Sequence, residues 1–291
     1  MIGTISAIGA AISWTWACFI WRNQTTKYDP IDINFFKNLF AFCVYTPALF
    51  SLNFDIEFKY FCILLFSGLV GIGLGDTFYL KSLKLIGTRK TLSIESLSPL
   101  IASLFGDFFI NENLSLKSWI GILLVSLSMI NIIGKESNLH YNDSILVPSK
   151  FKPKNYIYGL ISIFCAVFAA TLSRYVLVNS ELSPIETTEI RLIGSIIFLI
   201  PLTKLNIRLF VGEMERKERS NFFISIFLGT NLGILLQQIV FKELPIGIGW
   251  TLLSTTPIFS IIFARKEEGL ISREIIIFSF LLVIGISLII L

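Results

Sequence analysis

The sequence predicts an all-α membrane protein whose ten transmembrane helices form two inverted five-helix repeats around a central cavity. Two observations predict this fold: the composition and an internal repeat. Of the 291 residues, 54% are hydrophobic and 15% are charged, against about 25% charged in an ordinary soluble domain. One span needs roughly 20 mostly apolar residues, so ten spans take about 200 residues and leave about 90 for loops and ends. The composition therefore excludes a soluble globular enzyme, a sizeable extramembrane domain and an outer-membrane barrel, whose strands alternate apolar and polar residues.

Apolar runs separated by short polar segments define the ten predicted spans. They are residues 2–21, 34–52, 60–80, 91–110, 118–134, 156–178, 188–203, 221–241, 246–264 and 274–291. Glu95 interrupts the fourth span, and Glu189 and Arg191 interrupt the seventh. The predicted organisation is a first five-helix repeat over 1–134, a connecting loop over 135–155 and a second five-helix repeat over 156–291.

The second half of the chain repeats residues of the first half in the same order. Shifts of 154 and then 158 residues align Pro30 with Pro184, Lys37 with Arg191, Pro47 with Pro201, Ser67 with Ser225, Gly71 with Gly229, Leu74 with Leu232, Gly75 with Gly233, Lys84 with Lys242, Ser96 with Ser254 and Pro99 with Pro257. Because each copy holds an odd number of spans, the second copy enters the membrane from the opposite side. Inverted repeats are typical of secondary transporters, which hold their substrate near the midplane between the halves.

Four short motifs lie within the repeated segments. They are Ala-Ile-Ser-Trp ending at Trp14, a proline followed by a base in the second span, a glycine-rich third span ending in Tyr79-Leu80-Lys81-Ser82-Leu83-Lys84, and a proline in the fourth span followed by Asn111-Glu112-Asn113-Leu114-Ser115. Together they resemble the EamA-domain branch of the drug/metabolite transporter superfamily, over nearly the whole chain. The sequence departs from that pattern at Ser82, where alanine is usual, at Asn111, where glycine is usual, and in the sixth span, which lacks the tryptophan.

The resemblance implies a multi-pass protein of the cell (inner) membrane. Members of this family move amino acids, other small metabolites or drugs, usually outward. We therefore predict a secondary transporter that exports small metabolites or amino acids by alternating access, and not an enzyme. Two alternatives stay open: a membrane-embedded enzyme or lipid-handling protein that uses intramembrane carboxylates, and a non-transporting membrane subunit.

Polar side chains within the predicted spans are the candidate site residues, because each is costly inside a bilayer. Asp76 follows three closely spaced glycines and is expected to bind a proton or a substrate amine, or to pair with Lys81 near the membrane interface. Glu95 lies one helical turn before Pro99, and a proline there frees the Glu95 carbonyl and kinks the helix. The corresponding segment of the second half carries Thr256 and Pro257. The predicted pocket is therefore chemically asymmetric, with hydroxyls opposite the carboxylate.

The family resemblance implies further pocket residues: Trp14, Tyr79, Asn231, Gln237 and Trp250. The alternative for Trp14 is helix packing, and for Trp250 a place in the interfacial aromatic belt. We expect Lys37 and Arg191 to snorkel towards the headgroups or to form a gate.

Three further features of the spans have simpler interpretations. Arg174 is expected to contact an anionic substrate or to snorkel near the end of its span. The glycine pairs at four-residue spacing favour close helix packing. The four cysteines lie in apolar spans and are interpreted as small buried residues.

The sequence offers no pattern for a cofactor, a metal or a nucleic acid. The only histidine is His140 in the central loop, no CxxC pair is present, and the GxxxxGK[ST], HExxH and GxSxG motifs are absent. The predicted partners are a small-molecule substrate and the lipid bilayer, with coupling to a proton gradient or facilitated flow. Most Lys and Arg residues fall in the loops opposite the chain ends, so the positive-inside rule predicts both termini outside the cytoplasm, whereas relatives are usually drawn with both inside.

Overall fold

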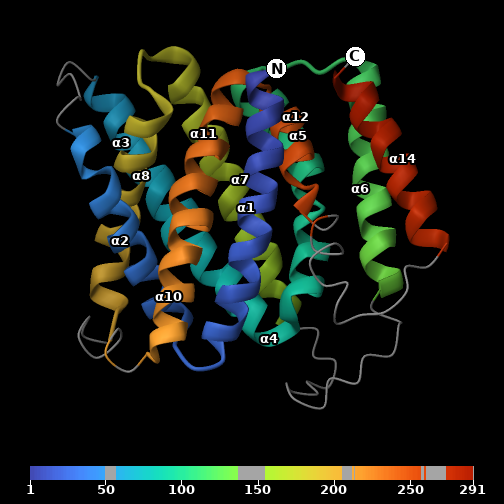
Figure 1. Ribbon diagram of the computed structural model, residues 1–291. Helices are drawn as coiled ribbons and strands as arrows, with labels where there is room; N and C mark the ends of the chain where they lie inside the picture. Colours follow the sequence, from blue (N-terminus) through green and yellow to red (C-terminus); the bar gives the residue numbers. More distant parts are fainter. Residues whose placement is uncertain are drawn as a thin grey trace.

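The computed structural model describes residues 1–49, 57–136, 155–204, 212, 214–256, 259 and 273–290, and these residues form helices and no strand. The helices run side by side, and both ends of the chain lie at the same end of the bundle (Figure 1). Four helical stretches are long and apolar enough to cross a membrane: Ile2–Thr25, Phe58–Thr88, Tyr156–Asn179 and Arg216–Glu243. Ser98–Ile110 and Leu116–Ser128 are shorter apolar helices. The all-helical membrane architecture is thus confirmed at this coarser level.

The elements of the second half follow the order of the first. The first half comprises α1 (Ile2–Thr25), α2 (Pro30–Leu49), α3 (Phe58–Ser67), η1 (Gly68–Gly75), α4 (Asp76–Glu95), α5 (Ser98–Ile110) and α6 (Leu116–Glu136). The second half comprises α7 (Tyr156–Asn179), α8 (Pro184–Leu199), the short η3 (Ile200–Leu202), α10 (Arg216–Ser225), η4 (Ile226–Leu232), α11 (Gly233–Glu243), α12 (Ile246–Leu253) and α14 (Arg273–Ile290).

The two π-helical segments, η1 and η4, mark the repeat in the backbone itself. They begin at Gly68 and Ile226, positions that correspond under the 158-residue shift. Because π-helical turns are rare and often lie at functional sites, their recurrence at equivalent positions supports the duplication. It also directs attention to the residues that follow them.

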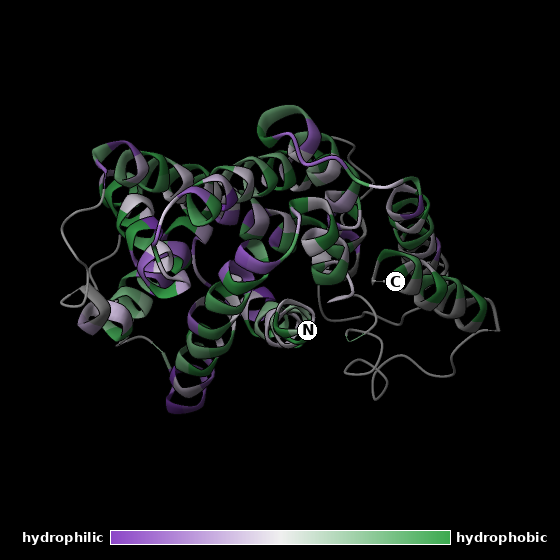
Figure 2. Cartoon of the chain, turned by 90° about the horizontal axis from the view of Figure 1, so that it is seen from above, coloured by the Kyte–Doolittle hydropathy of each residue, from purple (hydrophilic) through white to green (hydrophobic). Residues whose placement is uncertain are grey.

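The halves pack across one another rather than side by side. The segment η1 contacts α7 and α8 of the second half, and η4 contacts α1 and α2 of the first. The same exchange joins α4 to α7 and α11 to α1. The helices α6 and α14 pack as a pair at one side of the bundle, near the C-terminus (Figure 2).

The surface exposes many large apolar side chains, as expected of helices that face lipid. Large apolar side chains point outward on most of the helices, among them Ile5, Trp16, Phe108, Leu127 and Phe164. Hydroxyl and amide side chains are buried instead, including those of Thr15, Asn34, Asn38, Ser195 and Gln238. A bilayer removes the usual penalty for exposed apolar surface, so this pattern fits an integral membrane protein.

The fourth predicted span, 91–110, is interrupted rather than continuous. Helix α4 ends at Glu95, Ser96 and Leu97 form a turn, and α5 begins at Ser98 with Pro99 in its first turn. The prediction that Pro99 kinks one long helix is therefore wrong: it starts a new helix, where a missing backbone N–H costs nothing. The Glu95 carbonyl accepts a hydrogen bond from the Ser98 hydroxyl.

Two residues reverse the chain with left-handed backbone angles. Gly87, inside α4, has φ 82° and ψ 170°, a region open in practice only to glycine. Asn111, after α5, has φ 53° and ψ 37°. Asparagine tolerates this conformation better than other residues with a side chain, which explains its presence where the family pattern has glycine.

The turn after α5 also fixes Arg174, which was expected to snorkel or to meet an anionic substrate. Its guanidinium is bonded to the Glu112 carboxylate and donates to the Phe241 carbonyl at 2.5 Å. Glu112 also accepts a hydrogen bond from the backbone of Ile246 at 2.7 Å. Both expectations are wrong, because Arg174 and Glu112 together fasten the first half to the second.

The cysteines differ from one another in burial. Cys18 is buried and Cys165 is partly buried, whereas Cys43 and Cys62 are exposed on the helical surface. The prediction of four buried cysteines therefore holds for Cys18 only. His140 lies outside the described residues.

Candidate functional site

A cavity of about 70 Å³ lies where the two halves meet. A water molecule needs roughly 10–15 Å³ of such space, so the cavity has room for several waters or for part of a small solute. Seven of the predicted substrate-binding residues line it, namely Trp14, Asp76, Tyr79, Glu95, Gln237, Trp250 and Thr256. Arg191 lines it as well. Pro257 lies outside the described residues.

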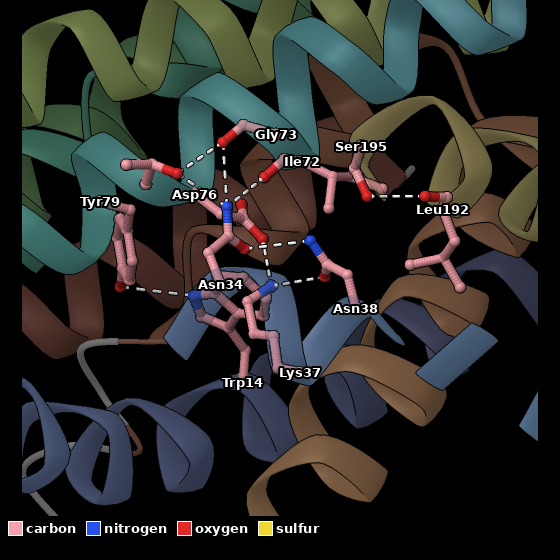
Figure 3. A network of polar contacts seen from close by, with 11 residues as sticks. Trp14, Asn34, Lys37, Asn38, Ile72, Gly73, Asp76, Tyr79, Leu192 and Ser195 are labelled. Carbon is pink, nitrogen blue, oxygen red and sulfur yellow. Dashed lines mark hydrogen bonds and ion pairs between the residues drawn. The ribbon is translucent and has the colours of Figure 1, made fainter. Parts of the chain in front are cut away.

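Asp76 forms the central ion pair of the site. Its Oδ2 lies 2.6 Å from the Lys37 Nζ (Figure 3). The Lys37 side chain is only 1% exposed, also donates to Asn38 Oδ1 at 3.1 Å, and lies 5.4 Å from the centre of the Trp21 ring. The expected snorkelling of Lys37 is wrong, because its charge is neutralised inside the protein.

Lys81, the alternative partner for Asp76, lies elsewhere. Its Nζ is 4.3 Å from the centre of the Tyr158 ring on α7. A cation over an aromatic face is a favourable contact. Asp76 is therefore paired with the second helix of its own half, at the point where η1 ends and α4 begins.

Asn34 is a site residue that the sequence analysis missed. Its Nδ2 donates to the Ile72 carbonyl at 2.8 Å, the Gly73 carbonyl at 2.9 Å and the Thr77 hydroxyl at 2.9 Å (Figure 3). π-helical geometry leaves carbonyls of η1 available to such a donor. The sequence signal for Asn34 was an amide within a predicted span, one helical turn before Lys37.

Glu95 faces the cavity through a second polar chain. The Tyr79 hydroxyl donates to Glu95 Oε2 at 3.3 Å, and Trp14 Nε1 donates to the same hydroxyl at 3.4 Å. Cys18 Sγ lies 3.2 Å from the Tyr79 oxygen. Helix α1 and the beginning of α4 thus hold the end of α4, which carries the carboxylate.

Arg191, on α8 of the second half, also lines the cavity. Its side chain is 3% exposed, and its Nε and Nη1 have no hydrogen-bond partner among the described residues. The expectation that Arg191 snorkels is therefore also wrong. A Cβ added to Gly71 would come within 3.2 Å of Nη2, so the glycine on η1 leaves space for the guanidinium.

Asn231 does not line the cavity. Its Nδ2 donates to the Ala41 carbonyl at 3.1 Å, and its own carbonyl accepts from the Tyr45 hydroxyl at 2.7 Å. Both partners are on α2, so Asn231 joins η4 to α2 in the way that Asn34 joins α2 to η1. An amide in an apolar span is the sequence signal for both packing and binding roles, and for Asn231 the structure shows packing.

Equivalent positions of the two halves line the cavity, but their side chains differ in charge and polarity. Under the 158-residue shift, three equivalent pairs all line it: Asp76 with Ile234, Tyr79 with Gln237, and Glu95 with Leu253. Both carboxylates come from the first half. The second half contributes neutral side chains at these positions, together with the guanidinium of Arg191.

A helical membrane protein with a polar cavity between two repeated halves has an architecture that is common among transporters with internal repeats. The EamA-like transporter family matches residues 1–134 and 153–291. The chain belongs to this family, and it is an integral, multi-pass membrane protein of a transporter family.

Comparison with solved structures shows the fold alone. One crystal structure, described only as that of a protein, has a TM-score of 0.71 at 15% sequence identity, covering 99% of this chain and 96% of the other. The comparison with curated proteins gives no match.

Proposed function

We propose that the chain is a secondary transporter that exports small metabolites or amino acids across the cell (inner) membrane by alternating access. In this proposal ten spans form two inverted repeats, and the substrate binds in the cavity between them. The observation that carries the proposal is the cavity itself, which is lined by charged side chains and formed by two halves that pack across one another.

Alternating access requires the cavity to face one side of the membrane at a time. The equivalent segments η1 and η4 each contact the first two helices of the opposite half. A rocking of one half against the other would therefore change the cavity walls on both sides at once, as repeat-based transporters do. Asp76 and Glu95 are the carboxylates that could exchange a proton if transport is coupled to a proton gradient.

The competing function, an enzyme that uses two carboxylates as acid and base, has less support. It requires Asp76 and Glu95 to converge on a groove open to lipid. Asp76 is bonded to Lys37 instead, and Glu95 accepts a hydrogen bond from Tyr79. Each carboxylate thus has its own network.

Solute exchange in proteoliposomes tests the proposal. Purified protein is reconstituted, and exchange of labelled amino acids and small metabolites is compared with protein-free liposomes, with and without a pH gradient. We expect exchange above the protein-free level, and acceleration by the gradient only if protons are coupled.

A matched pair of variants on α7 links exchange to the cavity. Ala166 lines the cavity, whereas Val178 is 58% exposed on the same helix. We expect Ala166→Phe to abolish exchange and Val178→Phe to leave it unchanged. Absence of exchange for every solute, or equal rates in the two variants, would overturn the proposal.

A further inference from the structure

Arg191 is a buried charge for which the described structure supplies no hydrogen-bonded counter-ion. It is 3% exposed and lines the cavity, and its Nε and Nη1 are without partners among the described residues. Buried charges in proteins are normally paired, because desolvation of an isolated charge is costly. A cation that stays unpaired at a cavity wall is a candidate for pairing with a ligand.

The internal repeat explains why Arg191 lacks a counter-ion. Its equivalent in the first half, Lys37, is neutralised by Asp76 at 2.6 Å. The position equivalent to Asp76 in the second half is Ile234, which also lines the cavity. The second half therefore keeps the base of the repeat and replaces its acid with an isoleucine.

Asp76 lines the same cavity as Arg191, but it is already engaged. Its Oδ2 is bonded to Lys37, and no ion pair joins it to Arg191 in the described part of the chain. Glu95 is the other carboxylate at the cavity, and its hydrogen bond comes from the neutral Tyr79 hydroxyl. One cation and one carboxylate thus face the cavity without an ion-pair partner.

We propose that Arg191 binds the carboxylate of the transported substrate, and that Glu95 receives its cationic group. The substrate class is then a small zwitterion with an apolar remainder, which deepens the proposed function and rests on it. A guanidinium presents paired N–H donors that match a carboxylate, which a lysine cannot do. A zwitterion also adds no net charge to the cavity, which is lined by Asp76, Glu95 and Arg191. Apolar side chains such as Ile72, Ile163 and Leu253 complete the lining.

Three probes of similar size separate the contributions of the two charged groups. They are leucine, leucinamide, which lacks the carboxylate, and 4-methylpentanoate, which lacks the amine. Binding to detergent-solubilised protein is followed by intrinsic fluorescence, since Trp14 and Trp250 line the cavity. Exchange is measured separately in proteoliposomes.

We expect wild-type protein to prefer leucine over both analogues. Arg191→Gln should weaken leucine binding at least about tenfold, with a much smaller effect on leucinamide, and Arg191→Lys should restore part of the loss. Glu95→Gln should weaken leucine and leucinamide and leave 4-methylpentanoate nearly unchanged.

A second pair of variants tests the missing acid without touching Arg191. Ile234→Asp supplies the carboxylate that the first half has, and Ile234→Asn is a control of the same size without charge. We expect Ile234→Asp to weaken leucine binding more than Ile234→Asn does, because it competes for the guanidinium.

The outcomes separate this inference from the proposed function. Exchange of solutes that lack a carboxylate, with leucine neither bound nor exchanged, would overturn the inference and leave the transporter intact. Equal effects of Arg191→Gln on leucine and leucinamide would do the same. Specific leucine binding that depends on Arg191, without exchange of any solute, would support the inference and contradict transport.

Discussion

The two halves of the protein share their helix order and their π-helical segments, but they treat the same base differently. In the first half, Lys37 is buried against Asp76 and is neutral as a pair. In the second half, Arg191 has Ile234 where that acid would be, and its guanidinium lines the cavity. The comparison teaches that the repeat supplies a common backbone, while single differences at equivalent positions give the cavity its polarity.

The helix crossings that join the halves also differ at equivalent positions. Where α8 crosses α3 and η1, a Cβ on Gly68 would lie 1.9 Å from the Arg191 carbonyl oxygen, and one on Gly194 would lie 2.1 Å from that of Leu65. The equivalent positions at the crossing of η4 with α2 are Ile226 and Phe40. The first crossing therefore brings backbones together, as small residues do in membrane helices, and the second is filled by side chains.

The largest expected effect is on the neutralised base of the first half. Asp76→Asn leaves Lys37 buried without a carboxylate, and removal of one partner of a buried pair costs about 3–5 kcal/mol. Thermal unfolding in detergent measures this loss of stability.

The second half supplies the comparison for this prediction. Arg191→Gln should cost much less stability than Asp76→Asn, since Arg191 has no hydrogen-bonded carboxylate to lose. The double variant Lys37→Gln/Asp76→Asn should recover much of the loss. Equal destabilisation by Asp76→Asn and Arg191→Gln would contradict the difference between the halves.

An intermediate effect is expected at the tight crossing. Gly68→Ala forces η1 away from α8, and overpacking of this kind typically costs about 1–3 kcal/mol. In Gly75→Ala on the same segment, the new Cβ would lie 3.2 Å from Cys165 Cβ and 3.3 Å from the Val70 carbonyl oxygen, contacts that are tight but far from the overlap at Gly68. The same unfolding assay should rank Gly68→Ala well below Gly75→Ala in stability, and the reverse order would refute a backbone contact at this crossing.

The smallest effect is expected where the second helix of each half begins. Helix α8 has a capping box, in which the Ser183 hydroxyl accepts from Glu186 N at 3.3 Å and Glu186 Oε2 accepts from Ser183 N at 2.7 Å. Helix α2 has one exposed hydrogen bond, from Ile31 N to Asp29 Oδ1 at 2.9 Å.

Ser183→Ala should therefore lower the free energy of unfolding by about 0.5–2 kcal/mol, and Asp29→Ala by less. Chemical denaturation of the two variants side by side measures the difference. A larger loss of unfolding free energy for Asp29→Ala would show that the capping box of α8 does not stabilise its helix more than Asp29 stabilises α2.

Much of the fold and part of the site could be predicted from the sequence. Apolar runs fixed the approximate helices because lipid requires them, and the shifted pairs located equivalent segments, including those that form η1 and η4. Asp76 and Glu95 stood out because charge is expensive inside a bilayer. The break before Pro99 was missed because the same proline fits a kink or a helix start, and the choice depends on whether the preceding carbonyl finds another donor, here Ser98.

The sequence by itself determined the membrane class, the duplication, the family and the identity of the costly polar residues, because composition and order suffice for these. Only the tertiary structure decided what each polar residue contacts. Lys37 meets an acid 39 residues away, and Asn231 a carbonyl 190 residues away, so neither contact follows from local periodicity. The physical reason is that a buried charge or amide is satisfied by whichever helix lies beside it, and the crossing of the two halves sets those neighbours.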